Sequence, residues 1–390
     1  MLLLDLSHTS HTQARTGIQR VCRNLHAALG DEAAAVTWDP YAGRWRQLDA
    51  GENACLAATA PSARRGARWP WTARLRGRWQ RLAGAAAPAL PAAAGVIVPE
   101  LFSPAVGAAL PTLFAGVAGP KVALFHDAIA LRFPELSPAG TVARFPAYLQ
   151  ELLAFDGIAA VSADSRDALV DYWRWLGRPV HPPVIALPLA LELCHAIRDK
   201  APAAGAPVVL CVGSLEGRKN HVTLFAAAER LWAQGRQFRL QVIGLAHPQT
   251  GRAAQEKMQA LQAAGRPLEY LGPVDDTALE QAYAACTFTV YPSLAEGFGL
   301  PVLESLARGK PCLCSGRGAL GEAARDGGCL TLDRVDDPAA LAAAMDRLLT
   351  NPAERATLTA AARARTFRTW PQYAAELKAW MQTLPRNGNS

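Results

Sequence analysis

The chain has 390 residues, which is long for one domain, and its 51% hydrophobic and 19% charged residues allow sizeable buried cores. The formal net charge of +7 favours anionic partners, namely phosphates, nucleic acid or an anionic membrane surface, and does not choose among them. The eight cysteines include no CxxC pair and no Cys/His cluster with zinc spacing, so we expect buried thiols in a reducing cytoplasm.

The first residues, MLLLDLS, predict a strand over 2–6 and not a signal peptide. A polar stretch follows, and then a helix begins at Gly17 with apolar residues at helical spacing. Strand, loop, glycine and helix in this order are typical of the opening of a Rossmann-like unit. Residues 82–99 lack charge but contain Pro88 and Pro91, so we expect no transmembrane helix there.

Residues 61–91 interrupt this pattern with arginines and tryptophans and no acidic residue. Such a segment can lie on an anionic bilayer, with indoles at the headgroup level and arginines on phosphate, or it can be a nucleic-acid patch or a disordered basic loop. We favour the membrane surface and expect no nucleic-acid partner. The candidate membrane or acceptor contacts are Arg68, Trp69, Trp71, Arg74, Arg76, Arg78 and Trp79.

Further strands are predicted in the first half of the chain over 95–98, 121–125, 158–161 and 184–187. The strand 121–125 ends in His126 and Asp127, and open α/β sheets bind ligands at the carboxyl ends of their strands. His126 is therefore a candidate ligand contact. We expect an N-terminal Rossmann-like domain over 1–188 and a proline-containing linker over 189–206.

The second half is more regular. Strands are predicted over 208–212, 240–243, 268–271, 287–291, 311–314 and 329–332, with helices between them. Alternating strands and helices predict a parallel sheet with right-handed crossovers. We therefore expect an α/β chain with a second Rossmann-like domain over 207–365 and a last helix within 366–390. A capping box is predicted at Thr277 and Glu280.

The stretch YPSLAEGFGLPVLESLARGKPCLCS, residues 291–315, predicts strand, glycine loop, short helix and strand. Pro301 fits the first helical position and Gly309 the position just past the helix end. The backbone N–H groups of residues 299–302 would then face an anionic ligand. Glu296 and Glu304, eight positions apart, can accept hydrogen bonds from hydroxyl groups.

A second motif, GSLEGRKNH, follows the strand 208–212. It has neither the G-x-G-x-x-G spacing of a dinucleotide site nor the G-K-[ST] of a P-loop. Arg218 and Lys219 at the carboxyl end of a strand can neutralise a diphosphate, the arginine as a fork and the lysine as a point charge.

The segment EGFGLPVLE resembles the E-x7-E signature of retaining glycosyltransferases of family 4, which have two Rossmann-like domains facing across a cleft, the glycosyltransferase-B fold. GSLEGRKNH is similar to the element that binds the donor diphosphate in that family, although Gly217 stands where the family often has proline. The segment around His126 resembles the family's "HD" segment beside the donor sugar, and RTGIQRVCRN, with Gly17, is similar to the start of many members. The arginine–tryptophan segment matches no family-wide feature. The last helix is similar to one that crosses back to the N-domain.

The resemblance implies a retaining glycosyltransferase that moves a hexose, mannose or a related sugar, from a nucleotide-diphosphate sugar to a lipid-linked or polysaccharide acceptor in bacterial cell-surface glycan synthesis. It implies that the domain over 1–188 binds the acceptor and the domain over 207–365 binds the nucleotide sugar. It also implies no metal and no cofactor, with a GDP-sugar as donor and a cytoplasmic location at the inner membrane face. Glu296 and His126 are the catalytic candidates. The donor contacts implied are Gly17, Ser214, Arg218, Lys219, Gly297, Phe298, Gly299, Leu300 and Glu304.

Two other functions stay open at this stage. One is a sugar-nucleotide epimerase of similar fold, for which we find no acid/base set around the sugar. The other is a membrane- or nucleic-acid-binding protein with a degenerate transferase fold.

Overall fold

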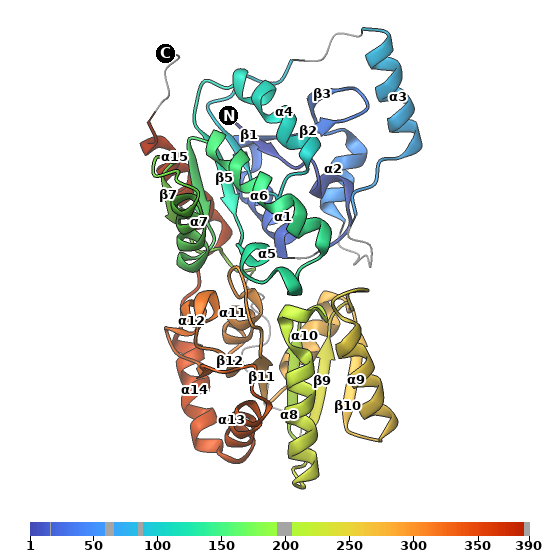
Figure 1. Ribbon diagram of the computed structural model, residues 1–390, viewed down its shortest axis with the longest axis vertical. Helices are drawn as coiled ribbons and strands as arrows, with labels where there is room; N and C mark the ends of the chain where they lie inside the picture. Colours follow the sequence, from blue (N-terminus) through green and yellow to red (C-terminus); the bar gives the residue numbers. More distant parts are fainter. Residues whose placement is uncertain (16, 59–65, 85–88, 193–204, 386–390) are drawn as a thin grey trace. The chain divides into compact units, whose positions relative to one another are not determined.

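A computed structural model of the chain describes residues 1–15, 17–58, 66–84, 89–192 and 205–385 (Figure 1). The chain forms two compact units. Unit 1 contains Met1–Asp127, Arg144–Ala190 and Thr369–Ser390, and unit 2 contains Ala128–Ala143 and Leu191–Arg368. Residues 128–143, which the sequence analysis assigns to the first domain, thus group with unit 2. Residues 193–204 of the predicted linker lie outside the described residues.

Unit 1 is built on a seven-stranded sheet of order β3-β2-β1-β4-β5-β6-β7. All neighbours are parallel except β2 and β3, which form an antiparallel edge. The strands are β1 (Leu2–Asp5), β2 (Ala33–Asp39), β3 (Arg44–Gln47), β4 (Val96–Val98), β5 (Lys121–Phe125), β6 (Gly157–Ala160) and β7 (Val184–Ala186). The sequence analysis predicts neither β2 nor β3.

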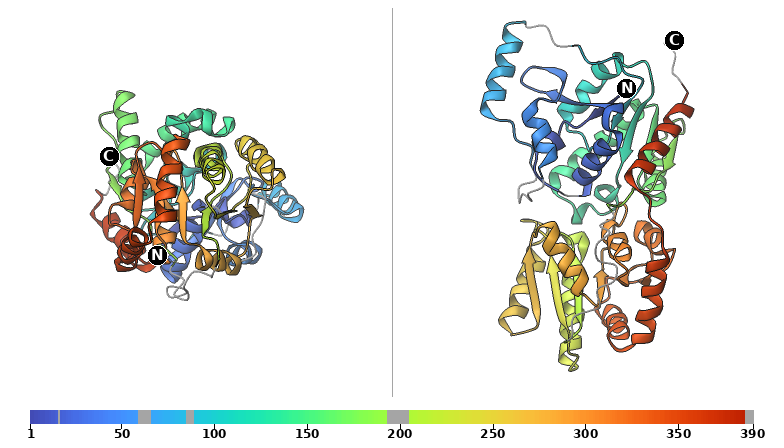
Figure 2. Two further views of the ribbon diagram at one scale, coloured as in Figure 1. Left: turned by 90° about the horizontal axis from the view of Figure 1, so that it is seen from below. Right: turned by 180° about the vertical axis from the view of Figure 1, so that it is seen from behind.

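Helices lie on both faces of this sheet (Figures 1 and 2). In chain order they are α1 (Gly17–Leu29), α2 (Ala50–Ala57), α3 (Trp71–Leu82), α4 (Pro104–Ala115), α6 (Ala139–Glu151) and α7 (Ala163–Trp175), whereas α5 (Ile129–Arg132) lies in the stretch that groups with unit 2. The last helix, α15 (Trp370–Thr383), packs against α1. A Cβ placed on Gly157 would come within 2.8 Å of both Trp380 and Leu384, so this glycine allows the end of the chain to approach β6 closely.

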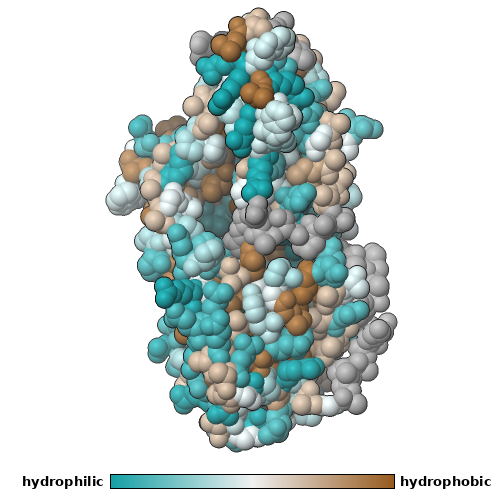
Figure 3. Space-filling model, turned by 90° about the vertical axis from the view of Figure 1, so that its right-hand side faces the viewer, coloured by the Kyte–Doolittle hydropathy of each residue, from teal (hydrophilic) through white to brown (hydrophobic). Residues whose placement is uncertain are grey.

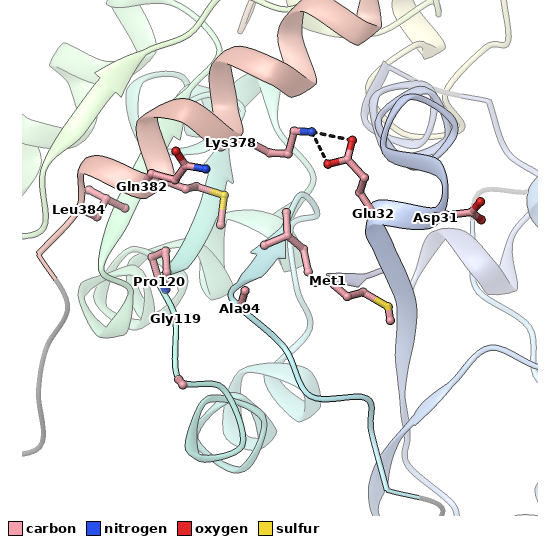
Figure 4. A pocket seen from close by; sticks show the side chains of 12 residues that line it. Met1, Asp31, Glu32, Ala94, Gly119, Pro120, Lys378, Gln382 and Leu384 are labelled. Carbon is pink, nitrogen blue, oxygen red and sulfur yellow. Dashed lines mark hydrogen bonds and ion pairs between the residues drawn. The ribbon is translucent and has the colours of Figure 1, made fainter.

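Figure 4 shows a pocket in unit 1 between α15 and the starts of β1 and β5. Lys378 Nζ donates to both carboxylate oxygens of Glu32 at its rim, at 2.7 and 2.6 Å. The pocket is lined by Met1, Leu2, Pro120 and Met381 among others, and by no residue singled out from the sequence. These residues lie at the amino ends of the strands, whereas open α/β sheets bind ligands at the carboxyl ends. The pocket is therefore not the expected site.

Unit 2 is built on a six-stranded, fully parallel sheet of order β10-β9-β8-β11-β12-β13. The strands are β8 (Val208–Val212), β9 (Arg239–Ile243), β10 (Leu268–Gly272), β11 (Phe288–Tyr291), β12 (Cys312–Ser315) and β13 (Cys329–Leu332). On β8, Val209 and Cys211 enter one apolar core and Val208 and Leu210 another, so this strand is buried on both faces.

The helices of unit 2 are α8 (His221–Ala233), α9 (Arg252–Ala263), α10 (Asp276–Ala285), α11 (Leu300–Ala307), α12 (Gly318–Ala324), α13 (Pro338–Thr350) and α14 (Pro352–Ala364). Helix α10 corrects one prediction. Its N-cap is Asp275, whose side chain accepts from Ala278 N at 2.8 Å, and not Thr277 of the expected capping box.

Both sheets follow the strand order 3-2-1-4-5-6 of a Rossmann-like fold, and unit 1 adds β7 at one edge. The order reverses between β1 and β4 in unit 1 and between β8 and β11 in unit 2. A crevice for ligands forms at the carboxyl ends of such strand pairs. The predicted α/β class with two Rossmann-like units is confirmed. Within the described parts of the chain, no helix combines the length and the apolar character that crossing a bilayer requires.

Candidate functional site

The two sequence motifs of unit 2 meet where the strand order reverses. Arg218 and Lys219 follow β8, Glu296 follows β11, and these strands are parallel neighbours. Arg218 Nη1 donates to Glu296 Oε2 at 2.7 Å, and Lys219 Nζ donates to Glu296 Oε1 at 2.5 Å. The fold thus brings Glu296 into contact with Arg218 and Lys219, which lie 78 and 77 residues before it in the sequence.

The two cations control the ionisation of Glu296, whose side chain is only 9% exposed. Burial alone would raise its pKa, but the charges of Lys219 and Arg218 outweigh burial and lower the pKa to about 2. Glu296 is therefore ionised at neutral pH. Lys219 is paired with this carboxylate and Arg218 with this carboxylate and with Glu216, and both cations are groups that a phosphate can engage through charge-assisted hydrogen bonds.

Glu216 and Ser214 hold Arg218 from its other side. Glu216 Oε2 is 3.3 Å from Arg218 Nε, and Ser214 Oγ donates to Glu216 Oε1 at 2.7 Å. The sequence analysis names Ser214 as a donor contact but gives no role to Glu216. In the structure Ser214 acts through Glu216, which fixes the direction of the guanidinium.

Asn220 joins the two loops and was also missed. It has a left-handed backbone, with φ 56° and ψ 36°, which asparagine tolerates better than most residues. Its Nδ2 donates to Pro292 O at 3.2 Å and to Val335 O at 2.9 Å, and Leu294 N donates to Arg218 O at 2.8 Å. These bonds preorganise the loop after β8 against the loop after β11. The sequence feature that could have indicated this role is an asparagine directly before a helix.

His221, the first residue of α8, is 1% exposed. Burial and, as a smaller cause, the nearby charge of Lys219 lower its pKa to about 4, so the imidazole is neutral at pH 7. Its Nε2 lies 3.6 Å from Cys211 Sγ. The neutral ring packs beneath the charged cluster, and we assign it a structural role.

The start of α11 narrows the predicted anion contacts. Gly299 is the N-cap with φ 92°, a conformation that favours glycine. Pro301 is the second helical residue and not the first. The N–H of Val302 donates to Gly299 O at 3.1 Å, which removes it from the expected set. The candidate backbone donors are therefore those of residues 297–300.

Glu304 lies one turn into α11 and is 6% exposed. Burial raises the pKa of Tyr283, and the charge of Glu304 acts in the same direction, so Glu304 lies close to Tyr283. Burial alone would lower the pKa of Arg308, and the charge of Glu304 is among the influences that raise it, so Glu304 also lies close to Arg308. Arg308 forms an ion pair with Glu280 and lies over the Tyr283 ring, 4.4 Å from its centroid. Phe298 and Leu300 pack partly buried against the core beside this helix.

His126 lies in unit 1 at the carboxyl end of β5. Its Nε2 is 2.7 Å from Pro99 O, just past β4. A carbonyl only accepts, so Nε2 carries the proton and Nδ1 of the neutral ring is an acceptor. Burial lowers the pKa of His126, which favours this neutral form. Gly17 begins α1, where an added Cβ would meet no atom within 4 Å.

The arginine–tryptophan segment forms α3, which the structure describes over 66–84. Trp69 differs from its neighbours, because its ring stacks on His11 at 3.8 Å and is partly buried. Trp71 and Trp79 are 71% and 67% exposed. Arg68, Arg74, Arg76 and Arg78 are exposed, and Arg76 also forms an ion pair with Asp49 at 2.8 Å.

Comparisons with known proteins agree with this architecture. Residues 195–365 match the family model "Glycosyl transferases group 1". The serotype-specific mannosyltransferase WbdA of Escherichia coli is 27% identical over 336 residues, which cover 80% of this chain and 38% of that protein. The O-antigen chain mannosyltransferase B of Escherichia coli is 30% identical over 216 residues, which cover 53% of this chain and 56% of that protein. The chain thus spans less than two thirds of either relative.

Among solved structures, sucrose-phosphate synthase from Thermosynechococcus elongatus superposes with a TM-score of 0.70 at 19% identity and covers 98% of each chain. The chain therefore has the glycosyltransferase-B fold, and the part that matches the group 1 glycosyltransferase model includes Arg218, Lys219 and Glu296.

Proposed function

We propose that the protein is a retaining glycosyltransferase that moves a hexose from a nucleotide-diphosphate sugar to a lipid-linked or polysaccharide acceptor in bacterial cell-surface glycan synthesis. The observation that carries this proposal is the ion-paired cluster of Arg218, Lys219 and Glu296 where the strand order of unit 2 reverses. The mannosyltransferase names of the two relatives favour mannose as the sugar and a GDP-sugar as the donor.

The cluster performs two tasks in this proposal. Arg218 and Lys219 bind the donor diphosphate and stabilise the charge that develops as the nucleoside diphosphate leaves. Glu296, displaced from the cations by the phosphates, accepts hydrogen bonds from sugar hydroxyls near the anomeric carbon. Glu304, one turn into α11, holds the ribose hydroxyls. Backbone donors of residues 297–300 contact sugar and phosphate.

Unit 1 supplies His126 and the acceptor site. The neutral His126 ring, with Nε2 engaged by Pro99 O, offers Nδ1 as an acceptor for a donor-sugar hydroxyl. Gly17 at the start of α1 leaves space for close approach to the backbone. The acceptor hydroxyl attacks on the face from which the diphosphate departs, and the leaving phosphate takes its proton, which retains the anomeric configuration.

The reaction is metal-independent in this proposal. The two cations beside Glu296 occupy the electrostatic role that a divalent ion fills in other transferases. The pair Asp336–Asp337 has a structural role instead, because Asp337 caps α13 by accepting from Ala339 N at 2.8 Å.

Helix α3 is the proposed membrane contact. Its exposed apolar residues are Trp71, Leu75, Trp79 and Leu82, at 71%, 55%, 67% and 88% exposure. At about 100° per residue they fall within an arc of about 80° on one side of the helix. Gly77 lies on the opposite side, where a Cβ would come within 2.8 Å of Tyr41.

The charge of α3 matches an anionic bilayer. The helix has no acidic residue, and Arg74 and Arg78 lie on one flank of the apolar side and Arg76 on the other. Figure 3 views the side of the molecule that bears α3, where scattered apolar atoms lie among hydrophilic ones. An indole and leucine stripe between arginines suits the headgroup region of a membrane. We therefore propose a cytoplasmic location, peripherally at the inner membrane face.

The transfer proposal is tested by incubating the purified protein with a panel of GDP- and UDP-sugars, a lipid-linked oligosaccharide acceptor and a chelator. We expect a glycosylated product whose new linkage keeps the anomeric configuration of the donor. Inversion at the anomeric carbon would contradict the retaining mechanism. Epimerised donor sugar in the absence of acceptor would instead identify an epimerase.

The membrane proposal is tested by co-sedimentation with vesicles that contain phosphatidylglycerol. Replacing Arg74, Arg76 and Arg78 by glutamine should weaken binding by about 100-fold or somewhat more, because each arginine near an anionic surface contributes about 1 kcal/mol. Trp175→Ser removes a tryptophan of 78% exposure on α7 and should leave binding unchanged. Equal co-sedimentation of the triple variant and wild type would overturn the membrane contact.

A further inference from the structure

Three cysteines that are scattered in the sequence converge beneath α11. The Sγ atoms of Cys312, Cys314 and Cys329 all lie within 4.8 Å of one another. The sheet explains this convergence. Cys312 and Cys314 are two residues apart on β12 and so project to the same face, and Cys329 on β13 is the register partner of Cys312. Leu313, between the two cysteines, belongs to the core on the opposite face.

The surroundings of the three thiols are apolar. Cys312 and Cys314 are 0% and 1% exposed and pack with Val302, Leu303 and Leu306 of α11. Cys329 is partly exposed, which gives the cluster one route to solvent. All three are free thiols in the structure.

A buried cation, Arg365, lies beside the cluster, close enough to Cys329 to interact with it electrostatically. The Arg365 side chain is only 8% exposed, and its Nη1 donates to Ala323 O at 2.8 Å. Its Nε is buried and has no hydrogen-bond partner among the described residues. A fixed, buried guanidinium can thus offset negative charge on the sulfurs.

We propose that Cys312, Cys314 and Cys329 form a three-thiolate site for a soft metal ion, Cu(I). Sulfur atoms about 2.3 Å from a shared ion in trigonal geometry lie about 4 Å apart, so the present separations need to close by less than about 1 Å. Soft thiolate ligands select Cu(I) among the common metals. This site is independent of the proposed transferase function.

Zn(II) fits this arrangement less well. Structural zinc takes four protein ligands, and three-ligand zinc sites keep water in the fourth position. In the described part of the chain the cluster contains only these three ligand atoms, and the space above them is filled by aliphatic side chains. Cu(I) is satisfied by three sulfurs without water. Its binding converts three thiols to thiolates, releases three protons to solvent and leaves a net charge of −2 beside Arg365.

The test uses the full chain, reduced and kept free of oxygen, in competition with the chelator bathocuproine disulfonate for Cu(I). We expect the wild-type protein to withdraw one Cu(I) per chain, and X-ray absorption at the copper edge to report three sulfur neighbours. Cys329→Ser, at the partly exposed position, should weaken binding by at least about 100-fold, since loss of a direct ligand exceeds the effect of losing its supporting contacts. Cys22→Ser removes one buried thiol of unit 1 and should bind as wild type does.

No uptake by the wild type, equal uptake by Cys329→Ser, or only two sulfur neighbours would overturn the site. Loss of two titratable thiols in air without metal uptake would also overturn it, in favour of a cysteine pair that forms a disulfide. Cys314→Ala provides a second variant, with the circular dichroism spectrum checking that it folds. It should lose Cu(I) as Cys329→Ser does.

Discussion

The two units share one strand order but carry different charged groups where that order reverses. In unit 2 this edge holds two cations, Arg218 and Lys219, which pair with Glu296, and Arg218 also pairs with Glu216. In unit 1 the corresponding ends of β1 and β4 carry Asp5 and Glu100, which are 0% and 3% exposed. Identical topology therefore does not decide what binds at this edge. The side chains of the following loops decide it.

The acidic groups of unit 1 are used within the unit. Glu100 accepts from the backbone N–H of His8 and Thr9 at 2.8 and 2.7 Å, and Ser7 Oγ donates to Asp5 at 2.5 Å. Burial, together with the charge of Glu100, raises the pKa of Asp5 well above its usual range. This edge offers only acidic side chains, whereas the edge of unit 2 offers two cations that can engage phosphate. We therefore assign the diphosphate of the proposed sugar-nucleotide donor to unit 2.

The largest expected effect comes from removing a cation of unit 2. Lys219→Ala should lower sugar transfer by about 1,000-fold, because loss of one group that stabilises transition-state charge costs roughly 3–4 kcal/mol. Turnover of the donor in the presence of acceptor measures it. Lys257→Ala removes a lysine from a surface ion pair with Glu229 and serves as the control. Near wild-type turnover in Lys219→Ala would remove the distinction between the two edges.

The units should also differ in how acid affects their stability. The pKa of His221 is about 4 in the folded protein and 6.5 by reference, so between these values the unfolded chain binds the proton and the folded chain does not. Unit 2 should therefore lose about 3 kcal/mol of unfolding free energy from this group as pH falls from 6.5 to 4. Denaturant unfolding of His221→Gln should show a flatter dependence over this window. An unchanged slope would contradict the buried neutral imidazole.

Asp5 makes the opposite contribution in unit 1. Its folded pKa is raised above the reference value of 3.8, so the folded protein keeps a proton that the unfolded chain releases. Stability from this group is present at low pH and is lost as pH rises above 3.8 toward the folded pKa. Asp5→Asn should remove that loss, measured by the same denaturant series. If both variants shift the pH dependence in the same direction, the contrast between the units fails.

In the proposed mechanism Glu296 competes with phosphates for Arg218 and Lys219, which predicts that donor binding and sugar transfer respond differently to its removal. Glu296→Gln frees Arg218 and Lys219 and should tighten binding of free nucleoside diphosphate by about tenfold, or about 1.4 kcal/mol, while transfer falls. Isothermal titration calorimetry and turnover measure the two effects. Glu256→Gln, which removes an exposed carboxylate of α9 that is 62% exposed, should change neither. Weaker nucleotide binding by Glu296→Gln would contradict the competition.

The smallest effect concerns one glycine from each unit. Gly299 has φ 92°, and a Cβ there would lie 3.2 Å from Leu320, so Gly299→Ala should cost about 1 kcal/mol of stability. Gly17 has no atom within 4 Å of an added Cβ, so Gly17→Ala should leave stability nearly unchanged. Thermal unfolding compares the two variants. Reduced donor binding by Gly17→Ala at unchanged stability would support close approach of the donor to α1, and a large loss of stability would contradict the open environment.

The part of the site that could be predicted from sequence consists of charged residues next to glycines at strand ends. Arg218, Lys219 and Glu296 each stand in a short motif, and parallel strands bring their carboxyl ends to one edge. The roles of Glu216 and Asn220 were not predicted, because they depend on partners such as Val335 O, which contacts Asn220 but lies far from it in the sequence. The convergence of Cys312, Cys314 and Cys329 depends on the register of β12 with β13, which no spacing in the sequence reveals.

The fold was predictable to a similar extent. Strongly apolar parallel strands such as β8 and β11 are visible in the sequence because they are buried on both faces. The antiparallel pair β2 and β3 is not visible in the sequence. Strand β2, AAAVTWD, contains mainly small residues, strand β3, RWRQ, contains mainly polar residues, and both strands are partly exposed. Edge strands carry a weaker apolar pattern and are defined mainly by their partners.

The most direct measurement is calorimetric titration of GDP, and separately UDP, into the wild-type protein, Lys219→Ala and the control Lys257→Ala. We expect one nucleoside diphosphate per wild-type chain, at least about tenfold weaker binding in Lys219→Ala through loss of a charge-assisted contact to phosphate, and unchanged binding in Lys257→Ala. Equal affinity of Lys219→Ala and wild type for both nucleotides would show that the cations at the carboxyl end of β8 do not hold the donor diphosphate.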